Sequence, residues 1–124
     1  MKAIVIYPKR ATFIVELPDK ISGLVAALSY VWDDCQAGIE EILGRESTID
    51  KANSMCGAKL RSSMVGDLII LDDRYFMVNG CGFIEVNPPQ FFQLQLTDER
   101  DRIMGWKWLK QKNLVEGEPV SEIV

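Results

Sequence analysis

The stretch that decides the fold is residues 61–86, "RSSMVGDLIILDDRYFMVNGCGFIEV". A polar lead-in ends at Gly66-Asp67, and two apolar runs then flank the charged triplet 72–74. Aspartate tolerates the backbone angles of tight turns, and glycine on both sides of Cys81 lets the chain bend sharply there. The stretch therefore predicts antiparallel strands joined by tight turns, with Cys81 as a small residue at a bulge.

The pattern continues towards the N-terminus with a second hairpin and a helical region. Residues 2–7 and 11–17 are rich in β-branched and apolar residues around Pro8, which predicts two strands and a turn. From Ile21 onward the apolar residues recur at the spacing of an amphipathic helix. One long helix or two short ones fit this stripe, with Gly44 marking the end.

Towards the C-terminus the pattern is less regular. Residues 45–60 are polar and predict a loop with at most one short helical turn. Pro88-Pro89 halts the chain, and residues 90–96 alternate like a further strand. Thr97 or Asp98 caps a last predicted helix, whose inward side chains are Ile103, Trp106 and Leu109.

Together these elements predict an α+β fold, with an antiparallel sheet of about five strands and two or three helices packed on it. A chain of 124 residues is one domain by length. We expect residues 1–115 to form that single compact domain and residues 116–124 to be an acidic, flexible tail.

Composition narrows the classes of partner. The net charge is −4 and no basic cluster exceeds Lys9-Arg10, so a nucleic acid is not the expected partner. No apolar run has the length of a signal peptide core or a membrane span. The three cysteines follow no disulfide or zinc pattern, which favours reduced thiols and a cytoplasmic location.

The chain contains no histidine. This excludes Ser-His-Asp and Cys-His catalysis, the common zinc hydrolase sites and the two-histidine iron site. Neither of the two standard phosphate-binding glycine loops occurs. The sequence therefore predicts a protein that is not an enzyme, with no catalytic residue, cofactor or metal, although a histidine-free enzyme remains the less favoured alternative.

Two groups of residues are candidates for binding a protein partner. Acidic residues gather in one stretch and could dock on a basic surface. The two tryptophans of the last helix lie on different sides of it, because successive residues are about 100° apart, so that one of them is expected to be exposed. The alternatives are a solvated acidic helix face and indoles packed in the core, and a homodimer is also open. The candidates are Asp33, Asp34, Glu40 and Glu41 in the acidic stretch, and Trp106 and Trp108 in the last helix.

A third group of polar residues precedes the first strand of the central stretch. Arg61, Ser62, Ser63 and Asp67 offer a guanidinium, two hydroxyls and a carboxylate. Such a set could bind an anion. Serine and aspartate also cap and turn the backbone, and this structural role is the favoured alternative.

The central stretch resembles the shared segment of the YodL-like proteins carried by phages and mobile elements. The matching residues are Arg61, Ser62, Met64, Val65, Gly66, Asp67, Tyr75, Gly82, Phe83 and Glu85. Asp72-Asp73-Arg74 departs from the pattern, in which an Asp-Gly turn is common. The resemblance firmly covers about 26 residues, and a looser likeness extends to the N-terminal hairpin and the helix after it.

What the resemblance implies is a small accessory protein of a phage or plasmid, acting in the bacterial host cell. It carries over no activity and no catalytic residue. We expect such a protein to act by binding a protein, for instance as an inhibitor of a host defence or regulatory system. The alternative is a structural or oligomeric scaffold protein.

Overall fold

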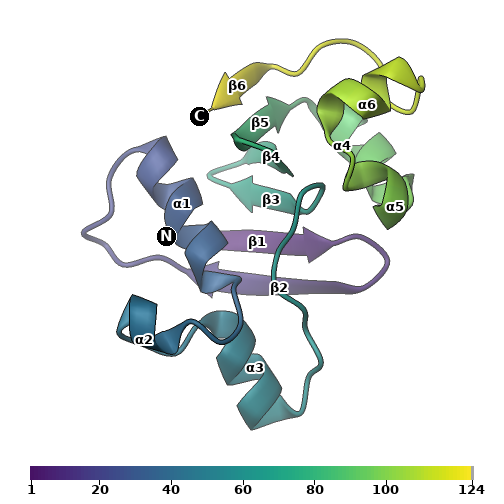
Figure 1. The fold of residues 1–124 in the computed structure, drawn as a ribbon. Helices are drawn as coiled ribbons and strands as arrows, with labels where there is room; N and C mark the ends of the chain where they lie inside the picture. Colours follow the sequence, from purple (N-terminus) through teal and green to yellow (C-terminus); the bar gives the residue numbers. More distant parts are fainter. Residues whose placement is uncertain (124) are drawn as a thin grey trace. The chain divides into compact units, whose positions relative to one another are not determined.

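The computed structural model describes residues 1–123 of the chain (Figure 1). Within them the chain forms six strands and six helices. In chain order these are β1 (Lys2–Tyr7), β2 (Ala11–Glu16), α1 (Leu24–Asp34), α2 (Glu40–Leu43), α3 (Thr48–Cys56), β3 (Leu68–Leu71), β4 (Arg74–Asn79), β5 (Gly82–Val86), α4 (Pro88–Leu96), α5 (Glu99–Arg102), α6 (Trp106–Gln111) and β6 (Ser121–Ile123).

The strands form one antiparallel sheet in the order β2-β1-β3-β4-β5-β6. The N-terminal hairpin joins the sheet through β1, because Ala3 pairs with Leu71 and Ile6 with Leu68. Strands β3, β4 and β5 follow one another as a meander. The predicted α+β class with an antiparallel sheet is therefore confirmed, with six strands where about five were expected.

The described residues group into two compact units. The first unit holds residue 1 and residues 15–63, and the second holds residues 2–14 and the chain from residue 64 onward. The first unit thus interrupts the second in sequence, from the end of β2 to the segment before β3, where we expected one domain over residues 1–115. It contains α1, α2 and α3, and the second unit contains most of the sheet and α4, α5 and α6.

The second unit has a continuous apolar core between β3–β5 and its helices. Figure 1 shows α4, α5 and α6 lying together beside these strands. The rings of Tyr75 on β4 and Phe91 on α4 are 4.9 Å apart between centroids, a separation typical of packed aromatic pairs. The buried residues of this core are Leu68, Met77, Ile84, Val86, Phe91, Leu94, Trp106, Leu109 and Val115.

The turns of the meander follow from the residues that occupy them. Asp72 and Asp73 both have positive φ, 54° and 60°, and they link the paired residues Leu71 and Arg74. Two positive φ angles are what a two-residue hairpin turn requires, so the predicted turn is confirmed. Cys81 lies in the next turn, because Asn79 pairs with Gly82, and it is exposed rather than packed at a bulge.

Residues 90–96 are helical, so the predicted strand is wrong there. The prolines at the first two positions of α4 begin the helix instead of only halting the chain. The side chain of Asn87 accepts a hydrogen bond from Gln90 N at 2.8 Å, and that of Gln90 accepts one from Asn87 N at 3.0 Å. This reciprocal cap fixes the start of the helix and overrides the alternation of apolar residues.

Two other helices differ from the expectation. Residues 45–60 contain α3, whose start is capped by Ser47, which accepts a hydrogen bond from Asp50 N at 3.1 Å. The last predicted helix is split into α5 and α6 at Gly105, which has a φ of +88°. Because of this break Ile103 is 42% exposed, although it was expected to face inward.

The segment expected to be a flexible tail is tied to the second unit. Gln90 Nε2 donates to the carbonyl oxygens of Glu116 and Glu118, both at 2.9 Å, and Lys110 Nζ donates to that of Gly117 at 2.7 Å. Residues 121–123 then pair with β5 as strand β6. Acidic composition favoured a solvated tail, but the contacts of Gln90 and of β5 with this segment join residues far apart in sequence and cannot be read from its composition.

Glu85 of β5 links the three strands β4, β5 and β6. Its two carboxylate oxygens accept hydrogen bonds from Arg74 Nε at 2.8 Å and from Arg74 Nη2 at 2.7 Å. Ser121 Oγ of β6 donates to the same carboxylate at 3.1 Å, and Val120 N donates to the Glu85 carbonyl at 2.7 Å. The hydrogen bonds from Arg74 hold the pKa of the Glu85 carboxyl below its ordinary value of 4.5.

A lowered pKa in the folded state means that protonation of Glu85 opposes folding. The stabilisation is present above pH 4.5 and is lost as the pH falls through the lowered pKa of the folded state. We therefore expect the difference in free energy of unfolding between the wild type and Glu85→Gln to be constant at neutral pH and to shrink as the pH falls below 4.5 through the lowered pKa. Urea unfolding at several pH values measures this, and a difference that stays constant would contradict it.

Candidate functional site

Asp33 and Asp34 are neighbours at the end of α1 but have opposite environments. Asp33 is exposed, whereas Asp34 is 3% exposed. The carboxylate of Asp34 accepts hydrogen bonds from the Arg45 guanidinium and from the Thr48 hydroxyl, and the same guanidinium lies 4.6 Å from the centroid of the Tyr30 ring. Asp34 therefore holds the helices of the first unit together and is not accessible to a partner.

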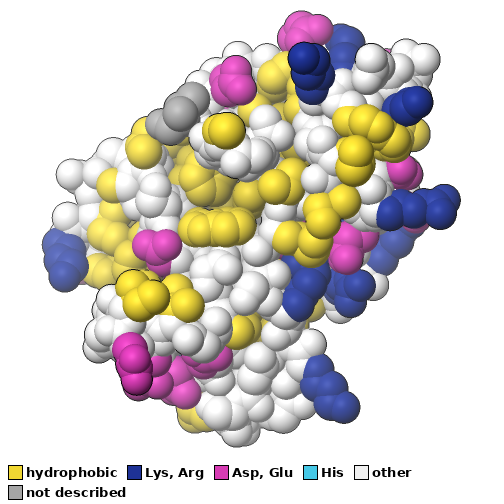
Figure 2. Space-filling model, viewed as in Figure 1, with side chains coloured by type: hydrophobic (Ala, Val, Ile, Leu, Met, Phe, Trp, Pro, Cys, Tyr) yellow, Lys and Arg dark blue, Asp and Glu magenta, His cyan; other side chains and the backbone are white. Residues whose placement is uncertain are grey.

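Two exposed acids of the first unit lie side by side on α2. Glu40 and Glu41 are exposed in its first turn, and Ile42, which follows them, is 83% exposed. No residue of α2 is buried. Figure 2 shows acidic side chains gathered where α2 lies in Figure 1. We call Glu40, Glu41 and Ile42 the α2 surface.

The two tryptophans of α6 are held within the second unit. Trp106 is 7% exposed and belongs to the core, and its backbone N–H donates to Asn79 Oδ1 at 3.3 Å. Trp108 is half-buried, packs against that core, and has Lys112 Nζ 5.6 Å from the centroid of its ring. The alternative to partner binding was that the indoles pack in the core. This alternative accounts for Trp106 and for the buried part of Trp108.

Arg61, Ser62 and Ser63 lie in the first unit, where they tie the chain to the end of α1. Ser62 Oγ accepts a hydrogen bond from Ala37 N at 2.8 Å, and Ser63 N donates to the Cys35 carbonyl at 2.8 Å. Arg61 Nη1 donates to the Ser62 carbonyl at 3.0 Å. The hydrogen bonds of Ser62 and Ser63 satisfy backbone groups that follow the last turn of α1.

Asp67 lies in the second unit, at the start of β3, and is 1% exposed. Its Oδ2 accepts a hydrogen bond from Met64 N at 2.9 Å, and its carbonyl accepts one from Val78 N at 2.9 Å. The carboxylate therefore closes the turn at residues 64–67 and starts the strand. The four polar residues thus contribute to local backbone structure in two separate units.

Arg102, which the sequence did not single out, is buried beside that turn. It is 1% exposed, its Nε donates to the Gly66 carbonyl at 3.0 Å, and its Nη1 donates to the Thr97 carbonyl. Gly66 has a φ of +94°, and a Cβ at this position would lie 2.5 Å from the Cβ of Arg102. The sequence "ERDR" at residues 99–102 is typical of a solvated helix, so no signal distinguished Arg102.

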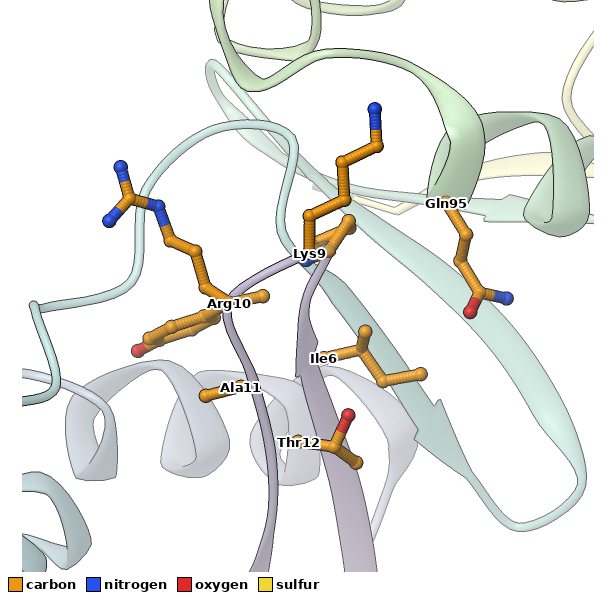
Figure 3. Close-up of a pocket in the computed structure, with 8 residues that line it drawn as sticks. Ile6, Lys9, Arg10, Ala11, Thr12 and Gln95 are labelled. Atoms are coloured by element: carbon orange, nitrogen blue, oxygen red, sulfur yellow. The ribbon is translucent and has the colours of Figure 1, made fainter. Parts of the chain in front are cut away.

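A hollow of about 380 Å³ lies between the N-terminal hairpin and α4 (Figure 3). Ile6, Thr12 and Gln95 are among the residues that line it, together with the turn residues Lys9 and Arg10. In Figure 3 the Arg10 side chain extends away from Gln95. The hollow therefore offers a hydroxyl and an amide as hydrogen-bonding groups.

The two cations of this turn are paired with carboxylates at the start of α5. Lys9 Nζ lies 2.9 Å from Asp98 Oδ1, and Arg10 Nε and Nη2 lie 2.6 Å and 3.2 Å from the two carboxylate oxygens of Glu99. The hydrogen bond from Lys9 holds the pKa of the Asp98 carboxyl below its ordinary value. These two ion pairs anchor the hairpin to α5. Since each cation is paired with a carboxylate, the turn presents little net positive charge.

Among residues 1–123 there is no group of three or more histidine, cysteine, aspartate or glutamate side chains that could hold a metal ion. Nor does any helix in this range have the length and apolar character needed to cross a membrane. Comparison with family models, with curated proteins and with solved structures finds no match.

Proposed function

We propose that this chain is a small accessory protein of a phage or mobile element that acts without catalysis, by binding a protein in the cytoplasm of a bacterial host. The observation that carries the proposal is the α2 surface, where an isoleucine that is 83% exposed follows two exposed glutamates. More specifically, we propose that the chain inhibits a host defence or regulatory system. This proposal is supported by the resemblance of residues 61–86 to the YodL-like proteins.

The α2 surface has the properties of a binding element. Four residues are far fewer than an isolated helix needs for stability in water, and none of these four is buried. Covering a side chain such as Ile42 on binding would contribute about 1.5–3 kcal/mol. Glu40 and Glu41 would add electrostatic steering towards a basic surface. The partner that fits is therefore a protein with an apolar socket bordered by lysine or arginine.

Three of the residues that carry the resemblance have structural roles in the sheet. Gly66 and Asp67 form the turn before β3, and Glu85 links β4, β5 and β6. The α2 surface lies outside the resembling segment, in the unit inserted between β2 and β3. This arrangement favours a sheet that the chain has in common with the YodL-like proteins, and an inserted unit that determines which partner is bound.

The test is capture of a protein from a lysate of the host cell by the immobilised full chain, followed by mass spectrometry. We expect a specific partner to be retained by the wild type and reduced at least about tenfold by Glu40→Lys/Glu41→Lys, because close like charges at an interface cost several kcal/mol. Ile42→Asp is expected to reduce capture as well.

The matched control is Asp19→Lys/Glu122→Lys, which makes the same change in charge at two other exposed residues. We expect it to retain the partner. Equal retention by all variants would contradict the α2 surface as the binding site, provided that circular dichroism shows each variant to be folded. Recovery of only the chain itself, as a large oligomer, would favour the scaffold alternative.

A further inference from the structure

The two edges of the sheet are built differently. At one edge β6 spans three of the described residues, Ser121–Ile123, with Glu122 in the middle. At the other edge β2 has six, and from Ala11 to Val15 it carries no charge, proline or glycine. Short or charged edge strands resist pairing with other chains, whereas long, uncharged, β-branched edges invite it. By these criteria β6 is protected and β2 is open to a further strand.

The backbone of β2 has hydrogen-bonding groups directed away from β1. Leu17 N donates to the Met1 carbonyl at 2.9 Å. The backbone N–H and C=O groups of the odd-numbered residues in this segment are therefore directed towards β1. In an antiparallel pair the N–H and C=O groups of alternate residues point to opposite sides. The N–H and C=O groups of Thr12 and Ile14 therefore point to the outer side of β2, the last strand in the sheet order.

An exposed apolar strip reaches this edge. Counting from the bond between Leu17 and Met1 puts Ile14 opposite Ile4, and these residues are 52% and 38% exposed. Ile70, which pairs with Ile4 on its other side, is already packed against the core of the second unit. The apolar surface thus extends from that core across β1 to Ile14.

We propose that β2 pairs antiparallel with β2 of a second copy of this chain, about a two-fold axis at Ile14. In this register Ile14 lies opposite Ile14 of the second copy, and Thr12 lies opposite Glu16 of that copy. The strand is self-complementary because no glutamate faces another glutamate and the outward N–H and C=O groups meet their counterparts. The pairing joins the two exposed isoleucine strips into one and covers part of each.

The test is the mass of the purified full chain in solution, by sedimentation equilibrium between about 1 µM and 100 µM. We expect the wild type to be a dimer at the upper concentration. Ile14→Lys places two lysines against each other at the two-fold axis, so we expect its dimer dissociation constant to rise at least about 100-fold. The matched control is Val25→Lys, at a site on α1 that is 50% exposed, and it should dimerise like the wild type.

Hydrogen exchange provides a readout specific to the strand. In the wild type, protection of the Thr12 and Ile14 amides should rise with protein concentration, and in Ile14→Lys it should stay low. A wild type that is monomeric at 100 µM, or an Ile14→Lys variant that dimerises as tightly as the wild type, would overturn the proposal. Neither outcome bears on the α2 surface, which these substitutions leave unchanged.

Discussion

Replacing Gly66 by alanine is expected to lower the free energy of unfolding by at least about 3 kcal/mol, the sum of backbone strain and steric overlap. The added Cβ would lie 2.5 Å from the Arg102 Cβ and 2.7 Å and 2.8 Å from the Arg102 carbonyl carbon and oxygen. Backbone atoms cannot move aside as the end of a flexible side chain can. The φ of +94° is also unfavourable for any residue with a Cβ.

Gly117→Ala is the control that separates these two causes. Gly117 also lies in the second unit and has a φ of +72°, but a Cβ there would meet only Gln90 Nε2, at an ordinary 3.5 Å. We expect this variant to lose about 1–2 kcal/mol, from the backbone conformation alone. Urea unfolding followed by circular dichroism measures both variants. Equal losses would show that the close approach of Gly66 to Arg102 contributes no strain.

Asp34→Asn is the second substitution with a large expected effect. It removes the charge that the buried carboxylate presents to Arg45, and breaking a buried ion pair costs about 3–5 kcal/mol. The Arg45 side chain is 36% exposed and keeps part of its hydration, so we expect a loss of about 2–3 kcal/mol.

The adjacent residue provides the matched control. Asp33→Asn makes the same chemical change at an exposed position, and we expect it to alter the free energy of unfolding by less than about 0.5 kcal/mol. Urea unfolding of the two single variants is sufficient for the comparison. A similar loss from both would mean that the pair of Asp34 with Arg45 contributes little to stability.

The hairpins were predictable because their signals are local. Tight turns at Asp72-Asp73 and apolar runs on both sides specify strand pairs within a few residues of each other. The helix α4 was missed because residues 90–96 alternate, although Asn87 and Gln90 three residues later form a cap that a local search could have found. Here the cap and the alternation of apolar residues compete. The cap determines the structure because it satisfies free backbone N–H groups at the start of the helix.

The candidate site was less predictable than the fold. Asp33 and Asp34 are indistinguishable in sequence, and only the position of Arg45 and Thr48 in the folded unit makes one of them buried. Arg102 lies in a charged tetrapeptide and is nevertheless 1% exposed, because the carbonyl oxygen of Gly66, distant in sequence, accepts a hydrogen bond from its guanidinium. Burial of a charged residue depends on such distant partners, which periodicity does not reveal.

The place of β1 in the sheet has a consequence for the order in which the chain folds. Strands β3–β5 and helices α4–α6 are consecutive in the chain, so their contacts can form after short loop closures. The contact of β1 with β3 joins residue 3 to residue 71 and must close a much longer loop, at an entropic cost that the later hairpins do not bear. We therefore expect the C-terminal half to nucleate folding, and the attachment of the N-terminal hairpin, synthesised first, to be the slow step that completes the sheet.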